Sequence, residues 1–137
     1  MPWRRGDLGL ALGAAAILLF AAGAAGAWQW REDRRADLQA TRLTGGDPER
    51  GRGMMRRYGC AGCHEIPGVR GADGRAGPSL RGVAGRIYIA GVVPNTAAAL
   101  VRWIEDPPAV APRTAMPRTG AAGQEARDIA AYLYTLR

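Results

Sequence analysis

The sequence predicts an all-α protein, with one N-terminal helix able to span a membrane followed by a small helical domain. Three observations lead to this expectation. Residues 8–30 carry no charge, apolar residues recur at helical spacing near the C-terminus, and no alternating run bounded by turn signals demands a sheet. Because the apolar run takes about a fifth of the 137 residues, the remainder is enough for one compact domain.

The uncharged run of 23 residues is long enough to cross a bilayer. Arg4 and Arg5 precede it, and Trp28 and Trp30 lie at its far end, where indole rings favour the boundary between lipid and water. A cleaved signal peptide is the alternative, because Ala25-Gly26-Ala27 is a small-x-small site. Length favours an anchor in residues 1–30. The flanking residues fit a twin-arginine signal poorly.

Residues 31–46 are polar and charged, and we interpret them as a tether ending at the Gly45-Gly46 break. The domain then covers residues 47–137. Asp47-Pro48-Glu49 is a good helix start, with Asp as the N-cap and Pro at the first position, and it predicts a helix over 48–58.

The next stretch, residues 66–92, is rich in glycine and is predicted to be loop. Asn95 is placed to cap a short amphipathic helix, which Asp106-Pro107-Pro108 must stop. Residues 110–119 are extended and contain two prolines. Residues 124–136 show apolar spacing typical of a C-terminal helix.

All 19 basic residues are arginines, and the net charge is +7. Residues 31–137 hold 17 arginines and 11 acidic residues, so this part keeps +6. The arginines are scattered singly or in pairs, without an arginine-rich helix face or interleaved aromatics, and nucleic acid is not an expected partner. A diffuse positive field is suited to steering an acidic redox partner or to contact with anionic lipid headgroups, and solubility alone is the alternative.

Cys60-Ala61-Gly62-Cys63-His64 is the C-x-x-C-H motif of c-type haem attachment. Two cysteines at this spacing on a helix end can reach the vinyl groups of neighbouring pyrrole rings, while the next residue presents its imidazole to the iron. A redox dithiol and a zinc site are the alternatives. The dithiol expects a strand before the motif, where a helix is predicted, and zinc needs a fourth ligand beyond these three residues.

His64 is the only histidine and there is no lysine, so a methionine is the remaining common sixth ligand of the iron. Met1 lies beyond the tether, and Met54 and Met55 lie in the helix that runs into the motif. Met116 follows His64 by 52 positions in a Pro-bordered extended segment, far enough for the chain to pass round a haem. The alternatives are a core methionine and an open sixth position.

Ligation by His64 and Met116 would saturate the iron, which suits single-electron transfer and leaves no place for a small-molecule substrate. No second histidine, paired-acid cluster or Ser/His arrangement offers other catalysis. We therefore expect an electron carrier rather than an enzyme.

With these residues in place, residues 47–137 resemble the class I cytochromes c. The resemblance rests on several short motifs in order, namely Gly51, Tyr58-Gly59, the Cys60-to-His64 motif, Gly77-Pro78-Ser79-Leu80, Met116-Pro117 and Asp128-Ile129-Ala130-Ala131-Tyr132-Leu133. It implies three to five short helices around one covalently bound haem c, with the first and last helices crossing.

The resemblance also implies roles for individual residues. The Pro78 carbonyl would accept a hydrogen bond from the His64 ring, and Tyr88 and Trp103 would wall the haem. Met55 stands where the family often has an aromatic residue at the helix crossing, with Tyr132 opposite. This departure is expected to loosen the crossing without affecting ligation.

Residues 88–96 are similar to small cytochromes that accompany terminal oxidases. We therefore expect a carrier that takes electrons from a quinol-oxidising complex and passes them to a terminal oxidase. A permanent haem subunit of a larger oxidoreductase and a gas-binding sensor are the alternatives. Because covalent haem attachment takes place outside the bacterial cytoplasmic membrane, the domain is expected on the periplasmic side of a single-pass protein.

Overall fold

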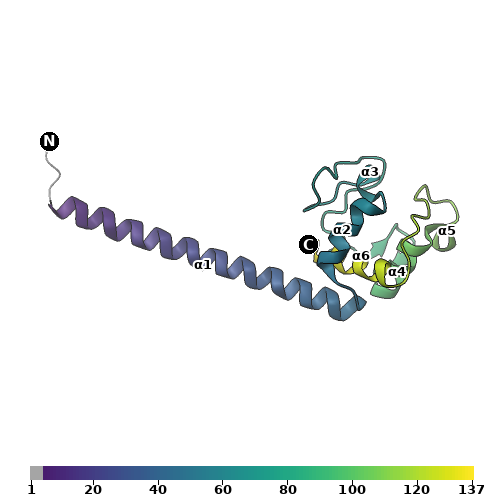
Figure 1. The fold of residues 1–137 in the computed structure, drawn as a ribbon, viewed down its shortest axis with the longest axis horizontal. Coiled ribbons are helices and arrows are strands. Elements are labelled where there is room, and N and C mark those ends of the chain that lie inside the picture. Colours follow the sequence, from purple (N-terminus) through teal and green to yellow (C-terminus); the bar gives the residue numbers. More distant parts are fainter. Residues whose placement is uncertain (1–4) are drawn as a thin grey trace. The chain divides into compact units, whose positions relative to one another are not determined.

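A computed structural model describes the backbone of residues 5–137 and the side chains of residues 12–137, and it is mostly helical (Figure 1). It divides into two compact units, residues 1–35 and 36–137. Met1, one of the methionines considered as a ligand, lies outside the described residues, as do Arg4 and the side chain of Arg5.

The first unit consists of the main part of α1 (Arg5–Thr44), a helix of 40 residues. Its segment from Leu12 onward is long and apolar enough to cross a membrane. The large apolar side chains of this segment are exposed, and Phe20 is 80% exposed. Near the end of the unit, the Arg34 guanidinium lies 4.8 Å from the centre of the Trp30 ring.

The segment predicted as a polar tether is helical as far as Thr44, and its second half belongs to the second unit. Ala40 and Thr44 are buried there. The helix ends at the predicted Gly-Gly break, where Gly45 has a left-handed φ of 68°. A Cβ on Gly46 would lie 2.1 Å from the Arg127 carbonyl oxygen, so the chain passes directly against the C-terminal helix.

Helix α2 (Pro48–Arg57) begins as its sequence predicts, because the Asp47 carboxylate accepts hydrogen bonds from the N–H groups of Glu49 and Arg50. It packs closely against α6 (Gln124–Thr135). At the crossing, a Cβ on Gly51 would lie 1.9 Å from the Asp128 carbonyl oxygen. Glycine at this position lets the two helix backbones touch, and the resemblance implied the crossing itself.

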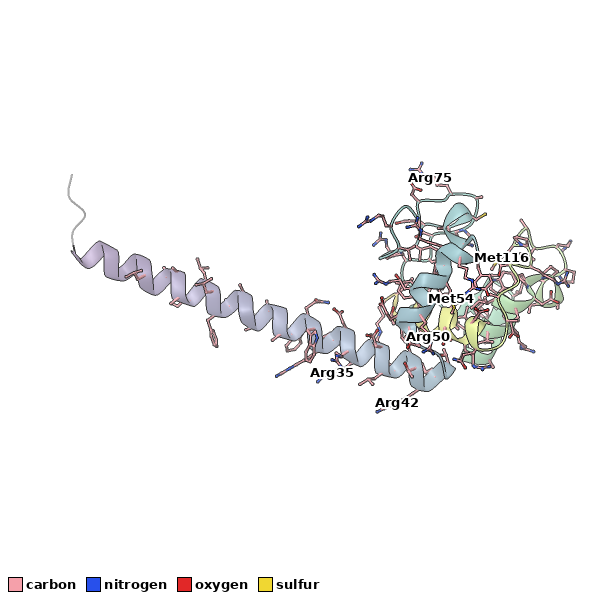
Figure 2. All side chains as sticks on the ribbon, viewed as in Figure 1. Arg35, Arg42, Arg50, Met54, Arg75 and Met116 are labelled. Atoms are coloured by element: carbon pink, nitrogen blue, oxygen red, sulfur yellow. The ribbon has the colours of Figure 1, made fainter. Side chains whose placement is uncertain are left out.

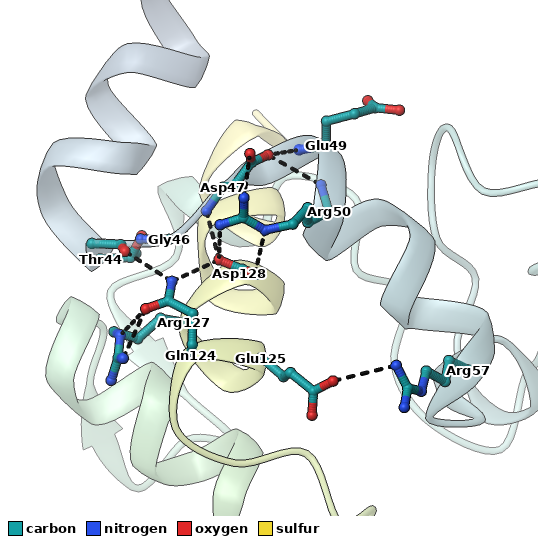
Figure 3. Close-up of polar contacts among 11 residues, drawn as sticks. Thr44, Gly46, Asp47, Glu49, Arg50, Arg57, Gln124, Glu125, Arg127 and Asp128 are labelled. Carbon is teal, nitrogen blue, oxygen red and sulfur yellow. Dashed lines mark hydrogen bonds and ion pairs between the residues drawn. The ribbon is translucent and has the colours of Figure 1, made fainter.

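The buried carboxylate of Asp128 joins the two helices (Figure 3). It accepts hydrogen bonds from the Asp47 N–H at 2.8 Å, the Arg50 guanidinium at 2.9 Å and the Gln124 amide at 2.8 Å. Burial raises the pKa of this carboxyl, but the hydrogen bonds from Arg50, Gln124 and Asp47 outweigh it, and the net pKa is lowered. Asp128 is therefore charged and paired at neutral pH.

Met55 fills the position where an aromatic residue was expected, and its side chain is completely buried. Tyr132 is buried as well, and its hydroxyl donates a hydrogen bond to the Pro67 carbonyl at 2.5 Å. A Cβ on Gly68 would lie 2.6 Å from that hydroxyl. The crossing is thus closed by a methionine and by a tyrosine that also holds the following loop.

Helix α4 (Ala97–Glu105) begins one residue later than expected, because Thr96 and not Asn95 is its N-cap. The Asn95 side chain is already engaged, with its amide donating to the carbonyls of Val83 and Arg86 at 2.9 Å. The helix ends at Glu105, directly before the Asp106-Pro107-Pro108 stop, as predicted. Asp106 then caps the one-turn helix α5 (Pro107–Val110), although Val110 was expected to begin an extended segment.

The glycine-rich loop contains a short 3-10 helix, η1 (Val83–Gly85), and a small antiparallel hairpin of β1 (Tyr88–Ile89) and β2 (Val93–Pro94). The expectation of no sheet is therefore modified by two strands of two residues each. The core of the second unit lies between α2, α4, α6 and this loop. Its largest members are Met55, Ile66, Leu100, Ile104, Ile129, Tyr132 and Leu133.

Candidate functional site

A cavity of about 330 Å³ opens in the second unit beside the core. All seven residues predicted to hold the cofactor line it, namely Cys60, Cys63, His64, Pro78, Tyr88, Trp103 and Met116. Most of the other lining side chains are apolar, among them Leu80, Val83, Ile89, Leu100, Ile104, Ile129 and Leu133. The folding of the chain therefore gathers the seven predicted residues, which lie up to 56 positions apart in the sequence, around one apolar space.

The two cysteines lie at the ends of α3 (Cys60–Cys63), a single helical turn. Gly59 precedes the turn in a left-handed conformation with a φ of 72°, which a residue with a side chain rarely adopts. Neither cysteine forms a disulfide. Residues three apart on a helix share a face, and both cysteines line the same cavity.

Burial raises the pKa of the Cys60 thiol. Reactive cysteines of dithiol redox motifs have a lowered pKa, because the thiolate is the attacking species. A helix also precedes the motif, where a dithiol of the thioredoxin kind expects a strand. Both observations argue against a redox dithiol at Cys60 and Cys63.

The His64 ring is held in one orientation by the loop that follows the motif. Its Nδ1 lies 2.7 Å from the Pro78 carbonyl oxygen, the hydrogen bond that the resemblance implied. Because a carbonyl only accepts, Nδ1 carries a proton, and in the neutral ring Nε2 is then the nitrogen with the lone pair. An imidazole fixed in this tautomer is prepared to bind a metal through Nε2.

Two glycines bring the same loop against the motif. A Cβ on Gly77 would lie 2.4 Å from Cε1 of the His64 ring, and a Cβ on Gly74 would lie 2.6 Å from the Cys63 carbonyl carbon. The Gly77 N–H donates to the Cys63 carbonyl at 2.8 Å, and the Leu80 N–H donates to the Glu65 carbonyl at 2.9 Å. This loop can therefore pack against the C-x-x-C-H motif only because Gly74 and Gly77 have no side chains.

Met116 reaches the cavity from the segment between α5 and α6, whereas Met54 lies on α2 (Figure 2). The Met116 N–H donates to the Thr114 hydroxyl at 3.1 Å. Met54 does not line the cavity, and Met55 contributes a fully buried side chain to the wall. The structure thus brings two methionines to the cavity, and only Met116 lies on a loop.

Arg86 was not predicted as a site residue, yet it is the only Arg, Lys, Asp or Glu among the described residues that line the cavity. Its guanidinium donates to the carbonyls of Ser79 and Arg81. The Arg86 carbonyl itself is held by the Asn95 amide. Nothing in the sequence distinguishes this arginine from the other eighteen, because its place depends on the fold of the hairpin.

The donor set fits a covalently held haem. Two thiols, an imidazole with a free Nε2 and a thioether border an apolar space, and apolar walls suit a porphyrin face. The single guanidinium at Arg86 suits a carboxylate of the kind that a haem carries at its edge.

The family model described as Cytochrome c matches residues 48–137, the larger part of the chain. Comparisons with curated proteins and with solved structures find no match. Cytochrome c domains bind haem c covalently, transfer electrons between redox proteins and are generally carriers rather than enzymes. The chain combines such a domain with a long apolar helix, and it belongs to the cytochrome c family.

Proposed function

We propose that this protein is a membrane-tethered carrier of single electrons with one haem c. The thioether bonds would form at Cys60 and Cys63, and His64 and Met116 would be the axial ligands of the iron. The observation that carries the proposal is the cavity that the C-x-x-C-H motif and Met116 share, with the His64 ring already oriented by the Pro78 carbonyl.

When bound, haem c supplies an iron that alternates between the ferric and ferrous states. The chain's own residues set the conditions for this exchange. The hydrogen bond to Pro78 keeps the His64 ring in place, and the apolar wall excludes water from the site. Arg86 offers a hydrogen-bond donor to a haem carboxylate, with Tyr88 and Trp103 forming the wall beside it.

A thioether at Met116 would favour the ferrous state and close the sixth position to other ligands. Such a site transfers electrons and binds no small-molecule substrate. A donor that oxidises quinol and an acceptor that is a terminal oxidase are the partners we propose. The similarity of residues 88–96 to small cytochromes that accompany oxidases supports this assignment.

The apolar helix is proposed to remain as an anchor in the bacterial cytoplasmic membrane, with the cytochrome domain on the periplasmic side. Its side chains from Leu12 to Trp30 are exposed, and the pairing of Arg34 with the Trp30 ring suits a membrane boundary. The mass of the purified protein tests the anchor, because cleavage after Ala27 would remove its N-terminal residues.

The test of the site is the absorption spectrum of the holoprotein, oxidised and reduced, compared with Met116→Ala. We expect a c-type reduced spectrum and a weak sulfur-to-iron band in the far red that disappears in the variant. Met54→Ala is the matched control, because Met54 lies outside the cavity wall and the band should persist.

A high-spin wild-type spectrum that Met116→Ala leaves unchanged would contradict ligation by this residue. Rapid binding of carbon monoxide to the reduced wild-type protein would then favour the gas-binding alternative. Recovery of the protein only within a larger purified assembly would favour a permanent subunit over a free carrier.

A further inference from the structure

The hairpin of β1 and β2 exposes apolar side chains. Ile87 is 79% exposed, Tyr88 is 55% exposed and Val92 is 52% exposed. Within residues 45–137, all of which the structure describes, these three are the only exposed large hydrophobic residues. Exposed apolar side chains gathered on one short element are characteristic of an interaction site.

This hairpin patch, Ile87, Tyr88 and Val92, is held in a defined shape. The Val92 N–H donates to the Ile89 carbonyl at 3.0 Å, closing a turn whose central residues Ala90 and Gly91 both have positive φ, 50° and 73°. Ala90 is the one described residue other than glycine with a positive φ. The Asn95 N–H also bonds the Ile87 carbonyl at 2.9 Å, so the exposure is built into the fold.

The hairpin patch borders the haem cavity. Tyr88 lines that cavity and is more than half exposed, so its ring links the site to solvent. Ile89 and Ala90 line the cavity as well. A molecule seated on the patch would therefore lie next to the redox centre.

The chain around the hairpin patch carries an excess of positive charge, even though two of its arginines, Arg81 and Arg118, form ion pairs with Glu65 and Asp106. Residues 74–104 contain four arginines, Arg75, Arg81, Arg86 and Arg102, and no acidic residue. Residues 107–124, which include the Met116 segment, add two arginines and again no acid. An occupant with acidic groups around its contact face is favoured, and a second copy of this basic domain is disfavoured.

We propose that the hairpin patch is the contact point for a protein redox partner whose docking face has an apolar centre and an acidic rim. The proposal rests on the electron-carrier function proposed above. Three side chains make a small contact, and a small contact suits the brief encounters of electron-transfer proteins. The arginines attract the partner from a distance, while Ile87 and Val92 hold it after contact.

The test compares the full-length holoprotein with Ile87→Ser, Val92→Ser and the double variant. Each is the sole copy in bacterial membranes that contain the terminal oxidase, and stopped-flow absorption follows oxidation of the pre-reduced haem when oxygen is added. Leu43→Ser is the matched control, because Leu43 is also 52% exposed but lies on α1 and does not line the cavity. Neither Ile87 nor Val92 lines the cavity, so haem binding and reduction potential should be unchanged.

We expect the double variant to be oxidised about tenfold more slowly, with unchanged salt dependence and an unchanged rate with ferricyanide, which needs no apolar contact. Leu43→Ser should match the wild type. Equal rates for the wild type and the double variant would overturn the docking proposal.

Repeating the reaction with detergent-solubilised holoprotein and purified oxidase separates a protein contact from a lipid contact. The defect should persist in detergent. A defect seen only in membranes would mean that the hairpin contacts lipid, and it would overturn the proposal. A wild-type protein that the oxidase does not oxidise at all would instead overturn the proposed carrier function, and the docking proposal with it.

Discussion

The segments that carry the two predicted iron ligands, His64 and Met116, are held in different ways. On the His64 side, the loop of residues 74–80 is joined to the motif by backbone hydrogen bonds from Gly77 and Leu80 and by the bond between His64 and Pro78. On the Met116 side, the hydrogen bonds are local or at the surface. Among them are the bonds that link Met116 to Thr114, and Arg118 to Asp106.

This difference indicates that the Met116 ligand is easier to release than the His64 ligand. The His64 ring cannot turn away without separating two closely seated backbones, and its neighbours are fixed covalently once the haem is attached. The Met116 segment contains two prolines and lies between α5 and α6 with fewer ties. We expect mild destabilisation to remove the Met116 thioether while the His64 side stays intact.

The largest expected effect comes from Gly77→Ala, which tests how tightly the His64 side is seated. The added methyl group would lie 2.4 Å from the His64 ring and could be accommodated only by moving the loop or the ring. We expect a destabilisation of about 3 kcal/mol or failure to accumulate holoprotein, because overpacking at rigid backbone is costly. Covalent haem content and thermal unfolding measure it.

Gly85→Ala is the matched control, because a Cβ at this position meets nothing within 4 Å. It should give normal yield and stability. If Gly77→Ala accumulated holoprotein as stable as Gly85→Ala, the loop at residue 77 would be able to move away from the His64 ring at little cost, and the His64 side would not be tightly packed.

The sequence was most informative where chemistry is local. The C-x-x-C-H motif, the Asp47 cap of α2 and the helical spacing of α6 each depend on residues within about one or two turns of each other, and the structure has the capped helix and the C-terminal helix as predicted. The site residues were predicted from short motifs and their order along the chain, and all seven of them line the cavity.

The sequence was least informative where a residue's role depends on distant partners. Asn95 was expected to cap α4, but the carbonyls of Val83 and Arg86 engage its amide and Thr96 takes the cap. Arg86 enters the cavity wall only because the hairpin forms. The burial of Ala40 was not predicted, because most of the residues around it in α1 are polar or charged.

A smaller effect is expected from Thr114→Val, which weakens the Met116 side alone. The substitution keeps the branched shape and removes the hydroxyl that accepts the Met116 N–H. Loss of one part-buried hydrogen bond costs about 1 kcal/mol. The far-red sulfur-to-iron band should therefore disappear at a lower denaturant concentration than in the wild type, while the helical signal changes little.

Thr119→Val is the control for this comparison, because Thr119 also lines the cavity but its hydroxyl accepts a longer bond from the Ala121 N–H, at 3.4 Å, rather than one from the Met116 N–H. The band should be as resistant as in the wild type. Loss of the band and of the helical signal together in every variant would mean that the two sides are held equally.

The smallest expected effect is acid release of Met116 through the exposed pair of Asp106 and Arg118, whose oxygen and nitrogen lie 2.9 Å apart. The hydrogen bond from Arg118 lowers the pKa of the Asp106 carboxyl, and it outweighs the opposing effect of burial. Because the pKa is lower in the folded protein, the stabilisation is fully present above the ordinary value of about 4 and is lost as pH falls through the folded value.

The far-red band should therefore weaken below about pH 4 before the far-ultraviolet circular dichroism of the helices changes. In Arg118→Gln the pair is absent at every pH, so the early acid loss should shrink and the band should be slightly weaker at neutral pH. Arg113→Gln removes the same charge from the same segment but leaves the pair, and it should titrate like the wild type. An identical acid profile in Arg118→Gln and Arg113→Gln would show that the pair does not hold Met116, and the weaker side of the site would then depend on Thr114 and the apolar wall alone.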